Sequence, residues 1–152
     1  MSLDTPLCTE SVTGQATVFH GSVLGNEAFL ALVVDDNDDN LLLMQYALEM
    51  LGVAFVAATS GDEALQLADQ HLFSLIFLDI VMSGKSGISV AQILRQQRCY
   101  SKTPIIAVTA LAFPKDRLRL LAAGFSDCLI KPYLLRELDV LVGKYRPVQH
   151  QH

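Results

Sequence analysis

The chain has 152 residues, of which 51% are hydrophobic, and its formal net charge at pH 7 is −5. This length and composition suit one domain with a substantial core, and they exclude a disordered chain or two ordinary domains. Nucleic-acid phosphates are bound by clustered cations, so the acidic composition argues against direct binding of nucleic acid.

The apolar segments and the cysteines indicate a cytoplasmic protein without membrane contact. The longest apolar stretches, such as residues 28–34 and 75–78, stop far short of the roughly 20 residues that span a bilayer. Residues 1–26 contain no Lys or Arg, whereas a secretory signal peptide begins with a basic segment. The three cysteines are widely spaced and form no CxxC pair, which favours free thiols in a reducing compartment.

The chain divides into three parts. Residues 1–27 carry Ser, Thr and Gly without sustained periodicity, and we expect them to form a flexible extension. From residue 28 to residue 146, strand-like apolar runs alternate with helix-like stretches five times. Residues 147–152 are expected to be a frayed tail.

Five strands are predicted, at residues 30–34, 53–58, 74–79, 103–109 and 127–130. Each is followed by a predicted helix, at residues 38–51, 61–71, 87–98, 114–123 and 133–145. The strands are apolar along almost their whole length, which is typical of strands buried on both faces. We therefore expect an α/β fold, a doubly wound five-stranded parallel sheet with helices on both faces.

Polar side chains stand at the carboxyl ends of four of these strands. Asp35 and Asp36 follow the first strand, and Asp79 ends the third. Thr109 ends the fourth strand, and Lys131 follows the fifth. Because ligands of open α/β sheets bind outside the carboxyl ends of the strands, three carboxylates, a hydroxyl and an ammonium are expected to converge there.

This set of groups is suited to phosphoryl chemistry. Neighbouring carboxylates raise one another's pKa, so the cluster needs positive charge from a hard cation such as Mg²⁺ and from Lys131. A carboxylate in such surroundings can attack phosphorus and form an acyl phosphate. Taken singly, each residue has a plainer interpretation, and Asp35 or Asp36 could simply cap the following helix. Their coincidence at one edge favours the functional interpretation.

The motifs also carry a family resemblance. The series Val34-Asp35-Asp36, Leu78-Asp79-x-x-Met82, Gly87, Thr109-Ala110 and Lys131-Pro132 resembles the receiver domain of bacterial two-component response regulators. The resemblance covers residues 28–146 and implies the flavodoxin-like receiver fold, with strand order 2-1-3-4-5.

The resemblance implies a metal ligand set around the phosphate-accepting aspartate. Asp36 and Asp79 would bind Mg²⁺ directly, and Asp35 would act mainly through water. The backbone carbonyl of Val81 would complete the ligands that the protein supplies.

It also implies a phosphorylation reaction and a switch. Asp79 would accept phosphate from the phosphohistidine of a sensor histidine kinase or phosphotransfer protein. Thr109 and Lys131 would engage the phosphoryl group, and the peptide between Lys131 and Pro132 would be cis. Thr109 would then move toward the phosphoryl group and relay the change, together with the residue at position 128.

Five positions near the site bear on how the switch would work. Ser83 replaces the proline that is usual in the family, which would loosen the loop after Asp79. Cys128 replaces the usual Tyr or Phe, which would mute the aromatic part of the switch, and Tyr133 is interpreted as a packing residue. Val81 and Leu111 are apolar, where polar residues would help water reach the acyl phosphate, so a long-lived phosphorylated state is predicted.

The leading hypothesis is a stand-alone, phosphorylation-dependent signalling switch that catalyses only its own phosphorylation and dephosphorylation. Its output would pass by contact with a downstream protein or a second copy, through the segments from Lys115 to Ala123 and from Tyr133 to Tyr145. The alternative is a degenerate receiver that binds partners independently of phosphate. An aspartate-nucleophile phosphatase needs a second acid where Val81 stands, and the acidic loop after the first strand would repel the phosphate of a flavodoxin's FMN.

Overall fold

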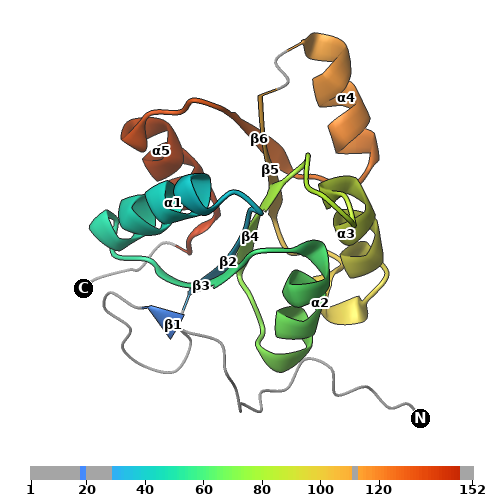
Figure 1. Cartoon of the computed structure of the whole chain (residues 1–152), viewed down its shortest axis with the longest axis horizontal. Helices are drawn as coiled ribbons and strands as arrows, with labels where there is room; N and C mark the ends of the chain where they lie inside the picture. Colours follow the sequence, from blue (N-terminus) through green and yellow to red (C-terminus); the bar gives the residue numbers. More distant parts are fainter. Residues whose placement is uncertain (1–17, 20–28, 111–112, 148–152) are drawn as a thin grey trace.

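The structure is a computed structural model that describes residues 18–19, 29–110 and 113–147. Five parallel strands form its sheet in the order β3-β2-β4-β5-β6 (Figure 1). Their bounds are Leu30–Val34 for β2, Ala54–Ala58 for β3, Leu75–Asp79 for β4, Ile105–Thr109 for β5 and Asp127–Ile130 for β6. The five predicted strands correspond, in chain order, to β2, β3, β4, β5 and β6. Their arrangement therefore confirms the predicted doubly wound sheet, in which the predicted strands have the order 2-1-3-4-5.

One further strand extends this sheet beyond the prediction. The two-residue strand β1 (Val18–Phe19) pairs antiparallel with β3. It lies within the segment for which a flexible extension was predicted. The rest of residues 1–27, residues 148–152 of the expected frayed tail, and Leu111 lie outside the described residues.

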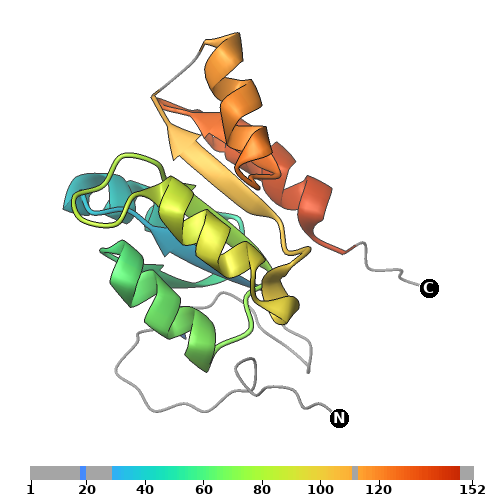
Figure 2. The same cartoon turned by 90° about the vertical axis from the view of Figure 1, so that its right-hand side faces the viewer.

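Helices cover both faces of the sheet (Figures 1 and 2). One face is covered by α1 (Asp38–Met50) and α5 (Leu135–Tyr145), and the other by α2 (Gly61–Gln70), α3 (Gly87–Arg95) and α4 (Pro114–Ala122). Within β2, Ala31 and Val33 pack under α1 and α5, whereas Leu32 and Val34 pack under the other three helices. This alternation between two buried faces explains why the strands are apolar along their whole length.

The helix boundaries differ slightly from the predicted ones, for local reasons. The third helix was predicted to reach residue 98 but ends at Arg95, and a 3₁₀ turn (η2, Arg98–Tyr100) follows. This turn buries the ring of Tyr100, whose hydroxyl donates to the carbonyl oxygen of His71 at 2.7 Å. The last helix begins at Leu135 rather than 133, with the Glu137 carboxylate accepting a hydrogen bond from the N–H of Leu134.

Two expectations about the whole chain can be compared with the described residues. None of the helices in this part of the chain is both long and apolar enough to cross a bilayer. Cys128 is a free thiol, but Cys99 is disulfide-bonded. The expectation that all three cysteines are free thiols is therefore wrong for Cys99. The cysteines consequently give no support to the expected reducing compartment.

Candidate functional site

The sheet order brings the predicted polar residues to one edge. The strands β2, β4, β5 and β6 are consecutive neighbours and run parallel, so their carboxyl ends meet. Asp79 is the last residue of β4 and Thr109 the last of β5, and both are buried. The N–H of Lys131 donates to the carbonyl oxygen of Thr109 at 2.8 Å, which places Lys131 directly beside that strand end.

Three carboxylates form the centre of this edge. Asp35, Asp36 and Asp79 each offer an oxygen, and these oxygens all lie within 4.8 Å of one another. Asp35 is 6% exposed and Asp79 is 5% exposed, whereas Asp36 faces solvent. Because hard cations such as Mg²⁺ prefer carboxylate oxygens, the donor set fits a divalent cation.

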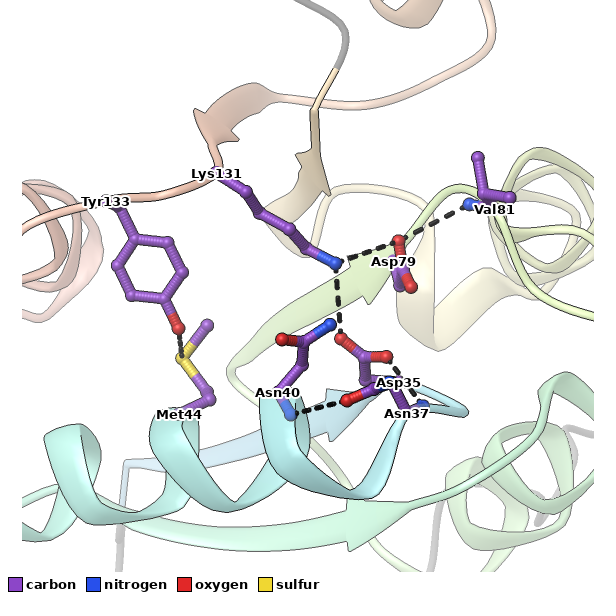
Figure 3. Close-up of polar contacts among 8 residues, drawn as sticks. All are labelled: Asp35, Asn37, Asn40, Met44, Asp79, Val81, Lys131 and Tyr133. Atoms are coloured by element: carbon purple, nitrogen blue, oxygen red, sulfur yellow. Dashed lines mark hydrogen bonds and ion pairs between the residues drawn. The ribbon is translucent and has the colours of Figure 1, made fainter.

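Lys131 supplies the positive charge of the site (Figure 3). Its Nζ atom lies 3.5 Å from Oδ2 of Asp35 and 3.6 Å from Oδ1 of Asp79. The ammonium therefore stands between the two buried carboxylates and offsets part of their repulsion. The peptide between Lys131 and Pro132 is cis, as expected.

The pKa of Asp79 reflects these surroundings. Burial and the neighbouring Asp35 carboxylate raise this pKa to about 6, while Lys131 and the N–H of Val81 act in the opposite direction. The Val81 N–H lies 3.3 Å from Oδ1 of Asp79. Asp79 is therefore mainly ionised at neutral pH, although it is poorly solvated, and added positive charge would stabilise its anion further.

The other buried acid is held by the loop that follows it. The N–H of Asn37 donates to Oδ1 of Asp35 at 2.9 Å. Asn37 is also the N-cap of α1, because its side chain accepts from the N–H of Asn40 at 2.8 Å (Figure 3). Neither Asp35 nor Asp36 therefore caps this helix, and both carboxylates belong to the acid cluster.

Asp36 is bound by a residue that the sequence interpretation had placed outside the chemistry. Oδ2 of Asp36 accepts from the N–H of Ser83 at 2.9 Å and from its hydroxyl at 3.2 Å. Ser83 was expected to loosen the loop after Asp79. Instead it ties this loop to an aspartate of the cluster, because serine has the N–H and hydroxyl donors that proline lacks.

Gly87 allows α3 to begin directly against the backbone of Asp79. A Cβ atom at this position would lie 2.2 Å from the carbonyl oxygen of Asp79, which no side chain can tolerate. The N–H of Gly87 donates to the carbonyl oxygen of Ile80 at 3.1 Å. This close approach explains why glycine is required at this position of the motif.

Cys128, an expected switch residue, and Tyr133, an expected packing residue, lie on opposite faces of the sheet. The Cys128 side chain is half-buried against the core under α2, α3 and α4, and burial raises the pKa of its thiol. Tyr133 packs on the other side of the sheet, with its hydroxyl 3.7 Å from Sδ of Met44. Tyr133 thus packs against the core, as expected from the sequence, and it does so on the face of the sheet opposite to Cys128.

A cavity opens beside the acid cluster. It has a volume of about 750 Å³ and lies between α1 and the segment that joins β6 to α5, with Asp35 and Lys131 at its polar side. Most of its lining is apolar and includes Leu43, Tyr46 and Met50, which are all exposed. Their spacing of three and four residues on a predicted helix was the sequence signal that could have indicated this surface.

The comparisons of the sequence with known proteins agree on one family. The family model for the response regulator receiver domain matches residues 31–142. The chain is 37% identical over 128 residues to the sensor protein GacS of Pseudomonas syringae, and 38% identical over 120 residues to the histidine kinase BarA of Escherichia coli. These matches cover 82% and 79% of the chain but only 14% and 13% of the two relatives. The chain therefore spans about a seventh of their length.

Solved structures show the same fold. The chemotaxis protein CheY4 of Vibrio cholerae has a TM-score of 0.74 and 26% identity, covering 78% of this chain and 98% of that one. The receiver domain of a sensor histidine kinase from Pseudomonas aeruginosa has a TM-score of 0.72 and 30% identity, covering 78% and 97%. The latter structure is described with a magnesium ion coordinated in its active site cleft.

Proposed function

The chain belongs to the response regulator receiver domain family of two-component signalling, and on that premise we propose that it is a phosphorylation-dependent switch with Asp79 as phosphate acceptor. The observation that carries this proposal is the position of Asp79. Its carboxylate is buried at a strand end, 3.6 Å from the Lys131 ammonium and within reach of two further carboxylates. This setting suits an ionised nucleophile that receives a negatively charged group.

The proposed reaction is a phosphoryl transfer from a phosphohistidine of a histidine kinase or phosphotransfer protein. A carboxylate oxygen of Asp79 bonds to phosphorus as the bond from phosphorus to the imidazole nitrogen breaks. The electron pair of that bond returns to the imidazole, which takes up a proton, and Asp79 carries an acyl phosphate. In a separate step, water attacks phosphorus, the bond from phosphorus to the Asp79 oxygen breaks, and inorganic phosphate leaves while the Asp79 carboxylate is regenerated.

We propose Mg²⁺ as the cofactor. Asp36, Asp79 and the carbonyl of Val81 would hold it directly and Asp35 through water. The oxygen-only donor set supports this assignment, as does the magnesium described for the related receiver domain. When bound, the cation supplies positive charge that offsets the charge on the transferring oxygens.

Two further side chains act on the phosphoryl group in this proposal. Lys131 binds one oxygen of the phosphoryl group, and its ion pair with the Asp79 carboxylate is partly replaced by this new ion pair. The Thr109 hydroxyl moves toward another oxygen, and this movement shifts the start of α4. Cys128, rather than an aromatic residue, stands on the neighbouring strand β6, opposite Ala107 of β5.

The cavity beside the acid cluster is the proposed contact surface for the phosphodonor. The donor must bring its phosphohistidine to Asp79, so it has to cover the carboxyl ends of the strands, where Asp79 lies. The exposed apolar residues Leu43, Tyr46 and Met50 adjoin that edge and line the cavity. An apolar helix face of the donor would bury them during the transfer.

Output is proposed to pass through α4 and α5 to a downstream protein or to a second copy of the chain, in the cytoplasm. Leu118 and Leu121 on α4 and Val140 on α5 are exposed, which leaves apolar surface for such a contact. Only Leu120 of the α4 leucines turns into the core.

Phosphate retention tests the proposal. The protein is incubated with labelled acetyl phosphate and Mg²⁺, and protein-bound label is measured beside an Asp79→Asn variant. The proposal predicts label on the wild type alone. No label on either protein, with both folded, would favour the phosphate-independent binding module.

A further inference from the structure

Ser83 makes two hydrogen bonds to the acid cluster that the roles proposed above leave unused. Its N–H lies 2.9 Å and its hydroxyl 3.2 Å from Oδ2 of Asp36, a residue 47 positions earlier in the chain. Asp36 belongs to the loop after β2, and Ser83 to the loop between β4 and α3. The two bonds therefore join separate loops at the edge that carries Asp79.

Asp36 is the member of the cluster that burial does not hold in place. Asp35 and Asp79 are buried and both lie beside the Lys131 ammonium, whereas Asp36 is exposed. Within the described residues, the hydrogen bonds to its carboxylate both come from Ser83 and both reach Oδ2. An exposed carboxylate without such bonds would sample several rotamers, and ordering it would cost entropy when a cation binds.

We propose that Ser83 is a positioning residue for cation binding, which holds Oδ2 of Asp36 and so presents this carboxylate to Asp35 and Asp79. The inference rests on the divalent-cation site of the proposed function. A carboxylate has two oxygens with about four acceptor positions, so Oδ1 stays available to the cation while Ser83 occupies Oδ2. Residues that orient a metal ligand in this way change metal affinity by about 10- to 100-fold.

The contact requires a residue other than proline at position 83. A proline at position 83, the usual residue in the family, has neither the N–H nor the hydroxyl that Asp36 accepts from. The contact also works in both directions, because a cation that fixes Asp36 strengthens the hold on the Ser83 backbone. Cation binding should therefore slow hydrogen exchange of the Ser83 amide.

Calorimetric titration of the full chain with Mg²⁺ tests this role. Ser83→Ala keeps the N–H and loses the hydroxyl, and we expect binding about 3- to 10-fold weaker. Ser83→Pro loses both donors, and we expect binding about 10- to 100-fold weaker. Ser83→Thr keeps both, and its affinity should stay within about twofold of the wild type. Thermal unfolding in EDTA serves as the control, since it shows whether each variant folds without metal and how far the loss of the two hydrogen bonds alone lowers the metal-free midpoint.

The outcomes separate the role of Ser83 from the cation site itself. Asp36→Asn is titrated alongside. If it binds Mg²⁺ more weakly while Ser83→Ala and Ser83→Pro bind with wild-type affinity, Ser83 has no positioning role and the cation site stands. If the wild type binds no Mg²⁺, the cation site and the role of Ser83 both fail. Should Ser83→Pro disturb the fold, the Ala and Thr pair, together with exchange of the Ser83 amide, still decides.

Discussion

The Nζ atom of Lys131 lies 3.6 Å from Oδ1 of Asp79, although the two residues are 52 positions apart in the sequence. This ion pair is possible because β4, β5 and β6 are neighbours whose carboxyl ends meet. It offsets part of the cost of burying Asp79 beside Asp35. In the proposed reaction the same ammonium would also bind an oxygen of the incoming phosphoryl group.

Removing this ammonium should slow phosphorylation. In Lys131→Met, the pKa of Asp79 should rise further, because burial and Asp35 act without the opposing charge. We expect phosphate incorporation from acetyl phosphate to fall on the order of 10²-fold. Lys115→Met, which removes an exposed lysine of α4, is the matched control. Equal rates in the two variants would show that Lys131 takes no part in the transfer.

Gly87→Ala should disturb Asp79 through its backbone. The added Cβ would lie 2.2 Å from the carbonyl oxygen of Asp79, so the strand end must move. We expect a loss of about 2–4 kcal/mol in the free energy of unfolding, together with slower phosphate incorporation. Gly143→Ala in α5 is the control, because its Cβ would meet nothing within 4 Å. Urea denaturation compares them, and a loss of the same size in both variants would contradict the account.

The stability of the metal-free protein should depend on pH through Asp79. Its pKa in the folded protein is about 6, above its ordinary value of 3.8. Ionised Asp79 therefore lowers stability above pH 6, and this cost disappears as the pH falls from about 6 to 4. Asp79→Asn should be more stable than the wild type by about 1–2 kcal/mol at pH 7.5 in EDTA, after allowance for solvent screening.

This difference should shrink toward pH 4.5, where Asp79 is protonated in the folded wild type. Denaturation curves at both pH values provide the measurement. A stability difference between the two proteins that is the same at pH 7.5 and pH 4.5 would show that the pKa of Asp79 is not raised.

The lifetime of the acyl phosphate should depend on Val81. This side chain is 72% exposed and stands two residues after Asp79, so a substitution there should leave the fold intact. Val81→Asn offers a polar group that can orient water toward phosphorus, and we expect faster loss of label after removal of the donor. Leu111→Glu is tested in parallel. An unchanged rate in both variants would remove the idea that these apolar residues protect the acyl phosphate.

The exposed apolar residues of α1 that line the cavity should affect phosphoryl transfer from a donor protein but not from acetyl phosphate. Leu43→Asp places a charge at the mouth of the cavity, on a side chain that is 63% exposed. We expect transfer from a phosphorylated histidine-containing donor protein to slow by at least about tenfold, because the charge cannot be buried without cost. Leu118→Asp on α4, at 68% exposure, is the matched control. Reduced labelling of Leu43→Asp by acetyl phosphate would instead indicate that the substitution damages the phosphorylation site itself.

The sheet and its acid edge could be predicted from sequence for a physical reason. Strands buried on both faces have a simple apolar pattern, and Asp35, Asp79 and Lys131 interrupt or follow that pattern abruptly. Since parallel strands end at one edge, the meeting of these charges followed from the order of the elements. The structure brings them within the distances of ion pairs.

Other features depend on geometry that no periodicity encodes. The bond between Ser83 and Asp36 joins two loops and requires a particular backbone path, so residue type suggested only a looser loop. The early end of α3 reflects the burial of Tyr100 below it. The cavity beside α1 was also missed, because the spacing of Leu43 and Tyr46 shows a face but not whether a neighbour covers it.

The most direct test of the central claim locates the phosphate chemically. The protein is phosphorylated with acetyl phosphate and Mg²⁺, reduced with borohydride, which converts an acyl phosphate of aspartate to homoserine, and analysed by peptide mass spectrometry. The account predicts homoserine at position 79 and at no other aspartate, and none when Mg²⁺ is replaced by EDTA. Homoserine at Asp35 or Asp36, or unmodified Asp79 in protein that retains phosphate, would contradict it.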